Sequence, residues 1–341
     1  MVGTKGNCVE QKCIPGCSEG NAQHLGKMSK SKEISQRIKE QAVLLGFLEC
    51  AIVPAGFLVE EKSRFQEWLD AGMHGEMGYM DRNKEKRLDP RLLIENAKTV
   101  IVVLQNYFPE KTQESTEAPV LSKYAYGTDY HFVMKDKLKK LLHFIQEEIQ
   151  PCNGRPFVDS APVLERAWAR QAGLGWVGKN SNLISVRHGS YFFIGELILD
   201  TELPFDTPRP VADHCGTCTR CIDACPTKAI VANQVVDARK CISYQTIEIK
   251  GDLDENLKGQ FENRVFGCDI CQDVCPWNLK AHPHEEPAFT PNPKLLKLTH
   301  EDWHNMDRPL FNELFKNSAV KRAGFKGLKR NLQFLRPEQN E

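Results

Sequence analysis

The stretch that decides the fold of this chain is CGTCTRCIDACP, residues 215–226. Its cysteines are separated by two, two and three residues, and a proline follows the last of them. A second stretch, CDICQDVCP at residues 268–276, repeats the end of this pattern without the leading cysteine, which Cys241 can supply. This spacing is typical of proteins that bind two four-iron, four-sulfur (4Fe-4S) clusters.

The two stretches predict a crossed arrangement of cluster ligands. A short loop can direct only three thiolates at one cluster, and in two-cluster ferredoxins the fourth comes from the other stretch. Pro226 and Pro276 each follow a cysteine that crosses over, and the fixed φ of proline turns the chain away there. The predicted ligands of cluster one are Cys215, Cys218, Cys221 and Cys275, and those of cluster two are Cys225, Cys241, Cys268 and Cys271.

Structural zinc and disulfides are the alternative uses of these cysteines. Zinc ribbons pair two C-x2-C knuckles without the third cysteine or the trailing Cys-Pro. Disulfides require an oxidising compartment, and residues 1–30 contain neither an apolar run of signal-peptide length nor a twin arginine. No stretch approaches the ~20 apolar residues of a membrane span. The sequence therefore predicts a soluble, cytoplasmic protein that does not bind membranes.

The length and charge of the chain limit its organisation. A chain of 341 residues can form two or three domains. Its 45 basic and 45 acidic residues balance, so nucleic-acid binding would need a local patch. We expect a disordered tail (1–30) in which Cys8, Cys13 and Cys17 are incidental thiols. An α/β domain (31–205), a two-cluster domain (206–285) and a helical tail (286–341) follow, with a proline-rich linker at 204–210.

The periodicity of apolar residues predicts both helices and strands in the larger domain. Helical spacing covers residues 35–48, 132–149 and 162–172. Strand patterns cover residues 48–53, 99–104, 183–186 and 191–199, the last two joined by a turn at 188–190. This mixture predicts an α+β fold.

Four stretches of the larger domain are rich in polar residues and glycine. They are residues 84–87, 124–131, 159–166 and 173–180. Asp159 ends a short predicted strand, where catalytic acids are common, although Asp159 or Ser160 would equally serve as a helix cap. The glycine-rich stretch lacks the end of a P-loop, and no G-x-G-x-x-G motif follows a strand. Asp129 and His131 begin a cobalamin-like Asp-x-His-x-x-Gly motif, but Met134 replaces its glycine.

These stretches and the cysteine motifs together resemble the epoxyqueuosine reductase family. The resemblance rests on GxDYH at 127–131, residues 159–166, AGLGWxGKN at 172–180, GS at 189–190, CISY at 241–244 and GCDICQxVCP at 267–276. It implies a nitroreductase-like cobalamin-binding domain, then a bacterial two-cluster ferredoxin-like domain and a short helical tail. It also implies an oxidoreductase that reduces epoxyqueuosine to queuosine at the wobble position (34) of tRNA, the final step of queuosine biosynthesis.

The resemblance also implies roles for individual residues. Asp159 matches the proton donor proposed for the family, and cobalamin is held without an axial ligand from the protein. The residues expected at the cobalamin site are Arg87, Ser122, Tyr130, His131, Asp159, Gly178, Lys179, Asn180, Leu183, Ser243 and Asp269. The expected partners are the anticodon loop of tRNA and an external electron donor, and the protein is expected to be a monomer. A cobalamin-dependent reductive dehalogenase and a non-enzymatic electron-transfer protein are the alternatives.

The C-terminal segment offers a tRNA-binding surface. Residues 316–336 contain seven basic residues and no acid. Phe325, Leu328, Leu332 and Leu335 follow helical spacing and predict one buried face. The basic residues predicted to form a ridge in water that contacts tRNA phosphates are Arg322, Lys326, Lys329 and Arg330. An ordinary solvated helix face is the alternative.

Overall fold

A computed structural model of the chain describes residues 19–207 and 210–336. Cys8, Cys13 and Cys17 lie outside these ranges. Helix α1 begins at Glu19, inside the segment for which the sequence predicts a tail. Within the described ranges, no helix combines the length and the apolar character needed to cross a bilayer.

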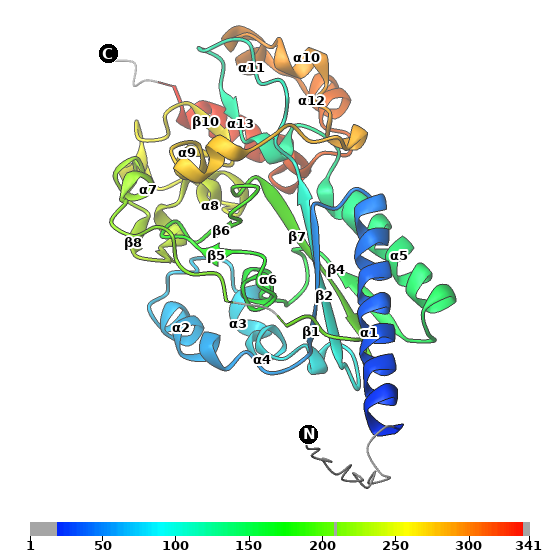
Figure 1. The fold of residues 1–341 in the computed structure, drawn as a ribbon. Coiled ribbons are helices and arrows are strands. Elements are labelled where there is room, and N and C mark those ends of the chain that lie inside the picture. Colours follow the sequence, from blue (N-terminus) through cyan, green and yellow to red (C-terminus); the bar gives the residue numbers. More distant parts are fainter. Residues whose placement is uncertain (1–18, 208–209, 337–341) are drawn as a thin grey trace, which may run out of the picture.

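A four-stranded antiparallel sheet forms the centre of the larger domain, in the order β1-β2-β7-β4 (Figure 1). Its strands are β1 (Glu49–Pro54), β2 (Thr99–Asn106), β7 (Phe192–Leu199) and β4 (Gly154–Phe157). The two inner strands are buried along almost their whole length. Such strands are apolar on both faces because helices cover both sides of the sheet.

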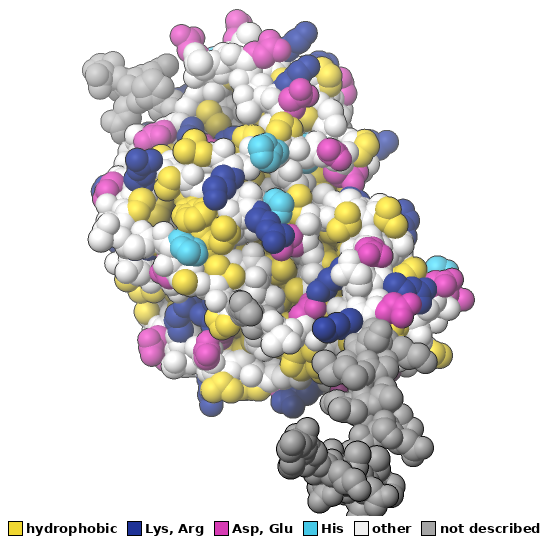
Figure 2. All heavy atoms as spheres, in the orientation of Figure 1, with side chains coloured by type: hydrophobic (Ala, Val, Ile, Leu, Met, Phe, Trp, Pro, Cys, Tyr) yellow, Lys and Arg dark blue, Asp and Glu magenta, His cyan; other side chains and the backbone are white. Residues whose placement is uncertain are grey.

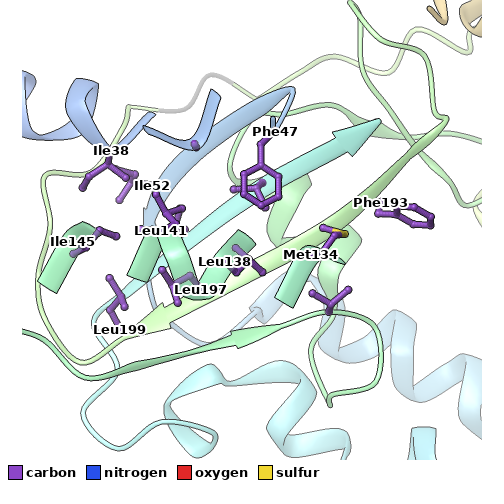
Figure 3. Close-up of a cluster of buried hydrophobic side chains, with 14 of the residues drawn as sticks. Ile38, Phe47, Ile52, Met134, Leu138, Leu141, Ile145, Phe193, Leu197 and Leu199 are labelled. Atoms are coloured by element: carbon purple, nitrogen blue, oxygen red, sulfur yellow. The ribbon is translucent and has the colours of Figure 1, made fainter. Parts of the chain in front are cut away.

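Helices α1 (Glu19–Leu44) and α5 (Tyr130–Glu148) pack on one face of the sheet (Figure 1). Their apolar side chains meet alternate residues of the strands in one continuous core (Figure 3). The opposite face is covered by α6 (Glu165–Gln171), whose Trp168 is fully buried against the sheet. Three further helices lie below or to the left of α6 in Figure 1, namely α2 (Val59–Asp70), α3 (Tyr79–Arg82) and α4 (Lys84–Leu88).

The strand pairing places two neighbouring predicted strands in different sheets. Residues 183–186 and 191–199 are joined by a turn, as expected, but their strands enter different sheets. The short β6 (Leu183–Ile184) pairs with β5 (Trp176–Val177), whereas β7 joins the main sheet. The reason is that β2 and β4 occupy both edges of β7, so no edge remains for β6.

The cysteine-rich module and the C-terminal tail share packing with the larger domain. The module contains α7 (Arg220–Asp223), β8 (Ile230–Ala232), β9 (Val235–Val236), α8 (Ile242–Ile247), β10 (Arg264–Phe266) and α9 (Ile270–Asp273). Strand β10 pairs in parallel with β3 (Val120–Leu121) of the larger domain. The tail contains α10 (Pro293–Leu296), α11 (His300–Asn305), α12 (Arg308–Leu314) and α13 (Gly324–Phe334). It packs around Trp303 and Phe315 and also contacts both β3 and β10. The three parts therefore hold one another in place.

Candidate active site

The cysteines predicted to bind cluster one lie together in the structure. All eight predicted ligands have free, half-buried thiols. Burial raises the pKa of the Cys221 thiol, and three neighbouring thiols raise it further, those of Cys215, Cys275 and Cys218. Because such interactions weaken with distance, these four side chains are neighbours, although Cys275 comes from the second stretch.

The remaining four cysteines form a second group. Burial raises the pKa of the Cys271 thiol well above its ordinary value, and Cys268 and Cys241 add to that effect more than Cys221 of the first group does. Cys241 in turn interacts with Cys225, the cysteine that crosses over from the first stretch. The chemistry of these donors, which are thiols in two groups of four, fits two 4Fe-4S clusters.

Polar groups of both domains surround the cysteine sulfur atoms. The Trp176 indole donates a hydrogen bond to Cys215 Sγ at 3.5 Å, and the Ala229 amide donates to Cys225 Sγ at 3.3 Å. The Asn182 amide lies 3.9 Å from Cys271 Sγ. Hydrogen bonds to sulfur are one means by which a protein adjusts the reduction potential of such clusters.

The glycine-rich loop at 173–180 holds the cysteine module against the larger domain. Trp176 packs edge-on against Trp277 with ring centroids 4.9 Å apart. Lys179 Nζ donates to the Gly216 carbonyl at 2.8 Å, and the Asn180 side chain donates to the Cys271 carbonyl at 3.2 Å. A Cβ on Gly178 would lie 2.5 Å from Ile184 Cδ1 in β6. Of the residues expected at the cobalamin site, Lys179 and Asn180 therefore contact the cluster loops.

Other residues expected at the cobalamin site also lie at the junction of the two domains. Buried Ser122 donates its hydroxyl hydrogen to buried Asp269, next to the cluster ligand Cys268. Ser243 lies two residues after Cys241, and its amide hydrogen-bonds to the thiol of that cysteine. Leu183 is buried in β6. Ser122 and Ser243 therefore contact the cysteine module directly.

A second set of polar side chains meets where β4 ends and α5 begins. Asp129 caps α5 by accepting the His131 amide at 3.0 Å. The His131 ring uses both nitrogens, with Nδ1 at 2.6 Å from Asp129 Oδ1 and Nε2 at 3.2 Å from Asp159 Oδ2. Tyr130 also hydrogen-bonds to Asp159, and its ring stacks on Phe193 at 4.1 Å. Two acids and a tyrosine thus fix the position of the imidazole.

Asp159 has an unusual backbone conformation. Its φ of +49° lies in the left-handed region, which residues other than glycine seldom occupy and which is concentrated at functional sites. Its side chain is 60 % exposed, and its amide donates a hydrogen bond to the Glu165 carboxyl group. The Asp159 carboxylate is therefore accessible to a ligand, while the hydrogen bond to Glu165 fixes the Asp159 backbone.

The charges of this site are coupled. Burial alone would lower the pKa of His131, but the hydrogen bonds to Asp129 and Asp159 outweigh it and raise the pKa to about 9. Desolvation opposes the charge of Asp159, but the His131 hydrogen bond prevails and lowers the pKa of that acid. Burial raises the pKa of Glu165 to about 8, and the charge of Asp159 adds to the effect. Near neutral pH, Asp159 is ionised between two protonated neighbours.

Two arginines interact with Asp159, and we call the space that its exposed side chain faces the recess. Arg87 of α4 is buried, donates to the Tyr79 carbonyl at 3.3 Å, and interacts electrostatically with Asp159. Its Nε has no hydrogen-bond partner among the described residues. Arg322, from the C-terminal tail, lies 6.0 Å from the centroid of the Tyr79 ring and also interacts with Asp159. Both guanidinium groups therefore lie within electrostatic range of the Asp159 carboxylate.

The predicted tRNA ridge differs from the expectation. The apolar face of α13 is buried as predicted, but Arg330 donates to the Ile249 and Gly251 carbonyls, and Lys329 donates to the His304 carbonyl. Arg322 pairs with Glu248 at 2.7 Å. Three of the four side chains therefore have partners in other segments, and the contact of these residues with tRNA stays a prediction. Lys326 alone of the four is exposed without a hydrogen bond or ion pair to a described residue.

Comparison with known proteins identifies the family. A sequence model described as "Epoxyqueuosine reductase QueG, DUF1730" matches residues 87–160, and one described as "4Fe-4S double cluster binding domain" matches residues 214–278. The chain is 54 % identical to the epoxyqueuosine reductase of Cellulophaga algicola over 91 % of its own length and 100 % of that protein. The chain belongs to the epoxyqueuosine reductase family. It is therefore an oxidoreductase, and the predicted α+β fold with a two-cluster module is confirmed.

Further relatives and solved structures of epoxyqueuosine reductases agree. The Escherichia coli enzyme is 40 % identical over 88 % of this chain and 80 % of its own. An epoxyqueuosine reductase crystallised with an epoxyqueuosine-modified tRNA-Tyr stem loop has a TM-score of 0.81 at 28 % identity, covering 89 % of this chain and 81 % of that chain. The Streptococcus thermophilus structure has a TM-score of 0.80 at 30 % identity, covering 89 % of this chain and 80 % of its own.

The sequence does not predict every residue of this region. Glu165 belongs to the polar stretch at 159–166, but Tyr79 and Glu196 lie outside all the stretches that the sequence marks as candidate sites. Glu196 had a detectable signal, since it is the one charged residue in the apolar run of β7. Tyr79 carries no comparable signal in the sequence, because only the fold brings it next to Arg87 and Arg322.

Proposed function

We propose that the protein reduces epoxyqueuosine to queuosine at position 34 of tRNA, with cobalamin and two 4Fe-4S clusters as cofactors. The observation that carries this proposal is a series of contacts between the cluster module and Asp159. Asp269, next to Cys268, accepts a hydrogen bond from Ser122. Tyr124, two residues after Ser122, packs edge-on against Tyr130, which hydrogen-bonds to Asp159. A module for electron transfer thus adjoins a site that can bind a substrate and protonate it. Family membership supplies the identity of the substrate.

The residues around Asp159 would fit a bound cobalamin. His131 is the imidazole of the recess, and both its nitrogens already contact carboxylates, so it is not free to coordinate cobalt. The buried Nε of Arg87 lacks a partner among the described residues and can donate to a polar group of the corrin. When bound, cobalamin supplies a strongly reducing cobalt centre for cleavage of the epoxide C–O bond.

The protein itself orients the substrate and provides protons. Oxygen leaves an epoxide readily only when it is protonated, because hydroxide is a poor leaving group. Asp159 is exposed to the recess and is held by His131 and Tyr130. Aromatic rings that line a site also stack on unpaired nucleobases, and Tyr79 is suitably placed between Arg87 and Arg322.

The direct test of the proposal is conversion of modified tRNA. Anaerobically purified protein should contain about eight irons and eight acid-labile sulfides. With cobalamin and a chemical reductant, it should convert epoxyqueuosine in tRNA to queuosine, measured by mass spectrometry of digested nucleosides. A protein with its full content of iron and cobalamin that leaves the modified tRNA unchanged would contradict the proposal.

The tRNA surface makes a separate prediction. Basic and acidic side chains are scattered over the face shown in Figure 2. We therefore expect phosphate binding to depend on a few individual basic residues. We expect Arg322→Ala with Lys326→Ala to raise the tRNA dissociation constant. The slope of log affinity against log salt should flatten by about 1.4–1.8, as for the loss of two phosphate contacts.

The control for this measurement is Lys140→Ala, because Lys140 is exposed on α5, where it pairs with Asp136. Arg330 stays unchanged in the test, since its hydrogen bonds to carbonyl groups hold the tail in place. A double variant with the same salt dependence as the control would place the tRNA surface elsewhere on the protein.

A further inference from the structure

Glu196 is a buried acid that the mechanism above does not use. It lies at the middle of the inner strand β7, and its side chain is 0 % exposed. Neither of its carboxyl oxygens hydrogen-bonds to any residue that the structure describes. An ionised carboxylate in such surroundings is strongly disfavoured, and burial raises the pKa of Glu196 well above its ordinary value. Glu196 is therefore a neutral carboxylic acid at neutral pH.

The position of Glu196 in the sheet connects it to the active site. Alternate residues of a strand face opposite sides, and its neighbours Gly195 and Leu197 face α5, so Glu196 faces α6. It lies opposite Phe157 of β4, two residues before Asp159. The acids that interact with Glu196 are Glu165, at the start of α6, and Asp159. We call Asp159, Glu165 and Glu196 the carboxyl cluster.

The reaction requires more protons than Asp159 can hold. When an epoxide becomes an alkene, both C–O bonds break, and the oxygen takes two protons and leaves as water. Two electrons come from the external donor through the clusters. Asp159 carries at most one proton, and His131 keeps it ionised in the resting site. It must therefore be protonated again from within the protein whenever bound tRNA covers the recess.

We propose that Glu165 passes a proton to Asp159 during turnover, and that Glu196 stabilises the Glu165 carboxylate left behind. This inference rests on the function proposed above. Glu165 is adjacent to Asp159, since its carboxyl group accepts the Asp159 amide hydrogen. Once Glu165 has lost its proton, the neutral acid of Glu196, which has no hydrogen-bond partner among the described residues, can turn toward it and donate a hydrogen bond. Two carboxyl groups that share one proton in this way are known from aspartic proteases.

The surroundings of Glu165 determine the expected pH dependence. The titratable and charged groups that face it are Asp159, His131, Tyr130, Arg166, Arg87 and Glu196. Because its pKa is raised to about 8, Glu165 holds its proton below that pH and loses it above. Single-turnover rates of the holoenzyme should accordingly fall as the pH rises through about 8.

The test compares conservative variants of the full-length holoenzyme. Glu165→Gln keeps the amide contact to Asp159 but carries no transferable proton, so the single-turnover rate should fall at least ~10-fold and lose its inflection near pH 8. Glu196→Leu removes the hydrogen-bond donor at position 196 and should slow turnover. Glu196→Gln keeps a donor there, so its rate should be close to that of wild type. The matched control is Glu67→Gln, because Glu67 is an exposed acid on α2.

An infrared titration provides a readout that does not depend on activity. The wild-type protein should show one protonated-carboxyl band that disappears near pH 8 and one that persists. Glu165→Gln should remove the first band, and Glu196→Gln the second. If wild type converts tRNA and Glu165→Gln retains its rate and pH profile, the relay is refuted while the proposed function stands. If wild type itself fails to convert tRNA, the proposed function fails, and the band assignments still test the carboxyl cluster.

Discussion

Asp159→Asn is expected to bind tRNA and cobalamin normally and to turn over at least ~100-fold more slowly than wild type. Asparagine has the same shape as aspartate and keeps a hydrogen bond to His131, but it carries no proton to donate. It also tolerates the left-handed backbone at this position, where φ is +49°. The substitution therefore removes the acid without disturbing the turn that presents it.

Single-turnover conversion of epoxyqueuosine in tRNA measures this loss, and filter binding measures the affinity for tRNA. Asp136→Asn is the matched control, since Asp136 is exposed on α5, where it pairs with Lys140. A turnover close to that of the control would show that Asp159 has a structural role at the end of β4, such as capping. Weaker tRNA binding with an unchanged single-turnover rate would show instead that Asp159 helps to position the tRNA.

Cys275→Ser is expected to remove cluster one and about half of the iron, although Cys275 belongs to the second cysteine stretch. The reason is that its thiol lies with Cys215 and Cys218. Cys271→Ser should instead remove cluster two, because Cys271 lies with Cys268 and Cys241. Either loss should abolish turnover, since electrons reach the recess through both clusters.

Double variants distinguish the two clusters by iron content and by electron paramagnetic resonance of the reduced protein. Cys215→Ser with Cys275→Ser should lose no more iron than Cys275→Ser alone, whereas Cys271→Ser with Cys275→Ser should lose both clusters. Cys152→Ser is the control, because Cys152 lies outside the module. If Cys271→Ser and Cys275→Ser remove the same cluster, the crossed assignment is wrong.

Local sequence patterns determined much of the fold. The helix predicted at 132–149 corresponds to α5 (Tyr130–Glu148), and the strand at 99–104 lies within β2 (Thr99–Asn106). The spacing of the cysteines is sufficient to indicate two clusters, and a sequence model of a double-cluster domain matches the same region. These features depend on residues within a few positions of one another, so the sequence displays them directly.

Only the tertiary structure decided which distant residues meet. The sequence shows a basic segment without acids at 316–336, but folding places Glu248 beside Arg322 and carbonyl groups beside Arg330. It likewise buries Glu196 of β7 within electrostatic range of Glu165 and Asp159, so that burial and these two acids raise the pKa of Glu196. Hydrophobic periodicity specifies which face of an element is buried, not which other element covers that face. Charge partners and pKa values depend on that covering element, and therefore on the folded chain as a whole.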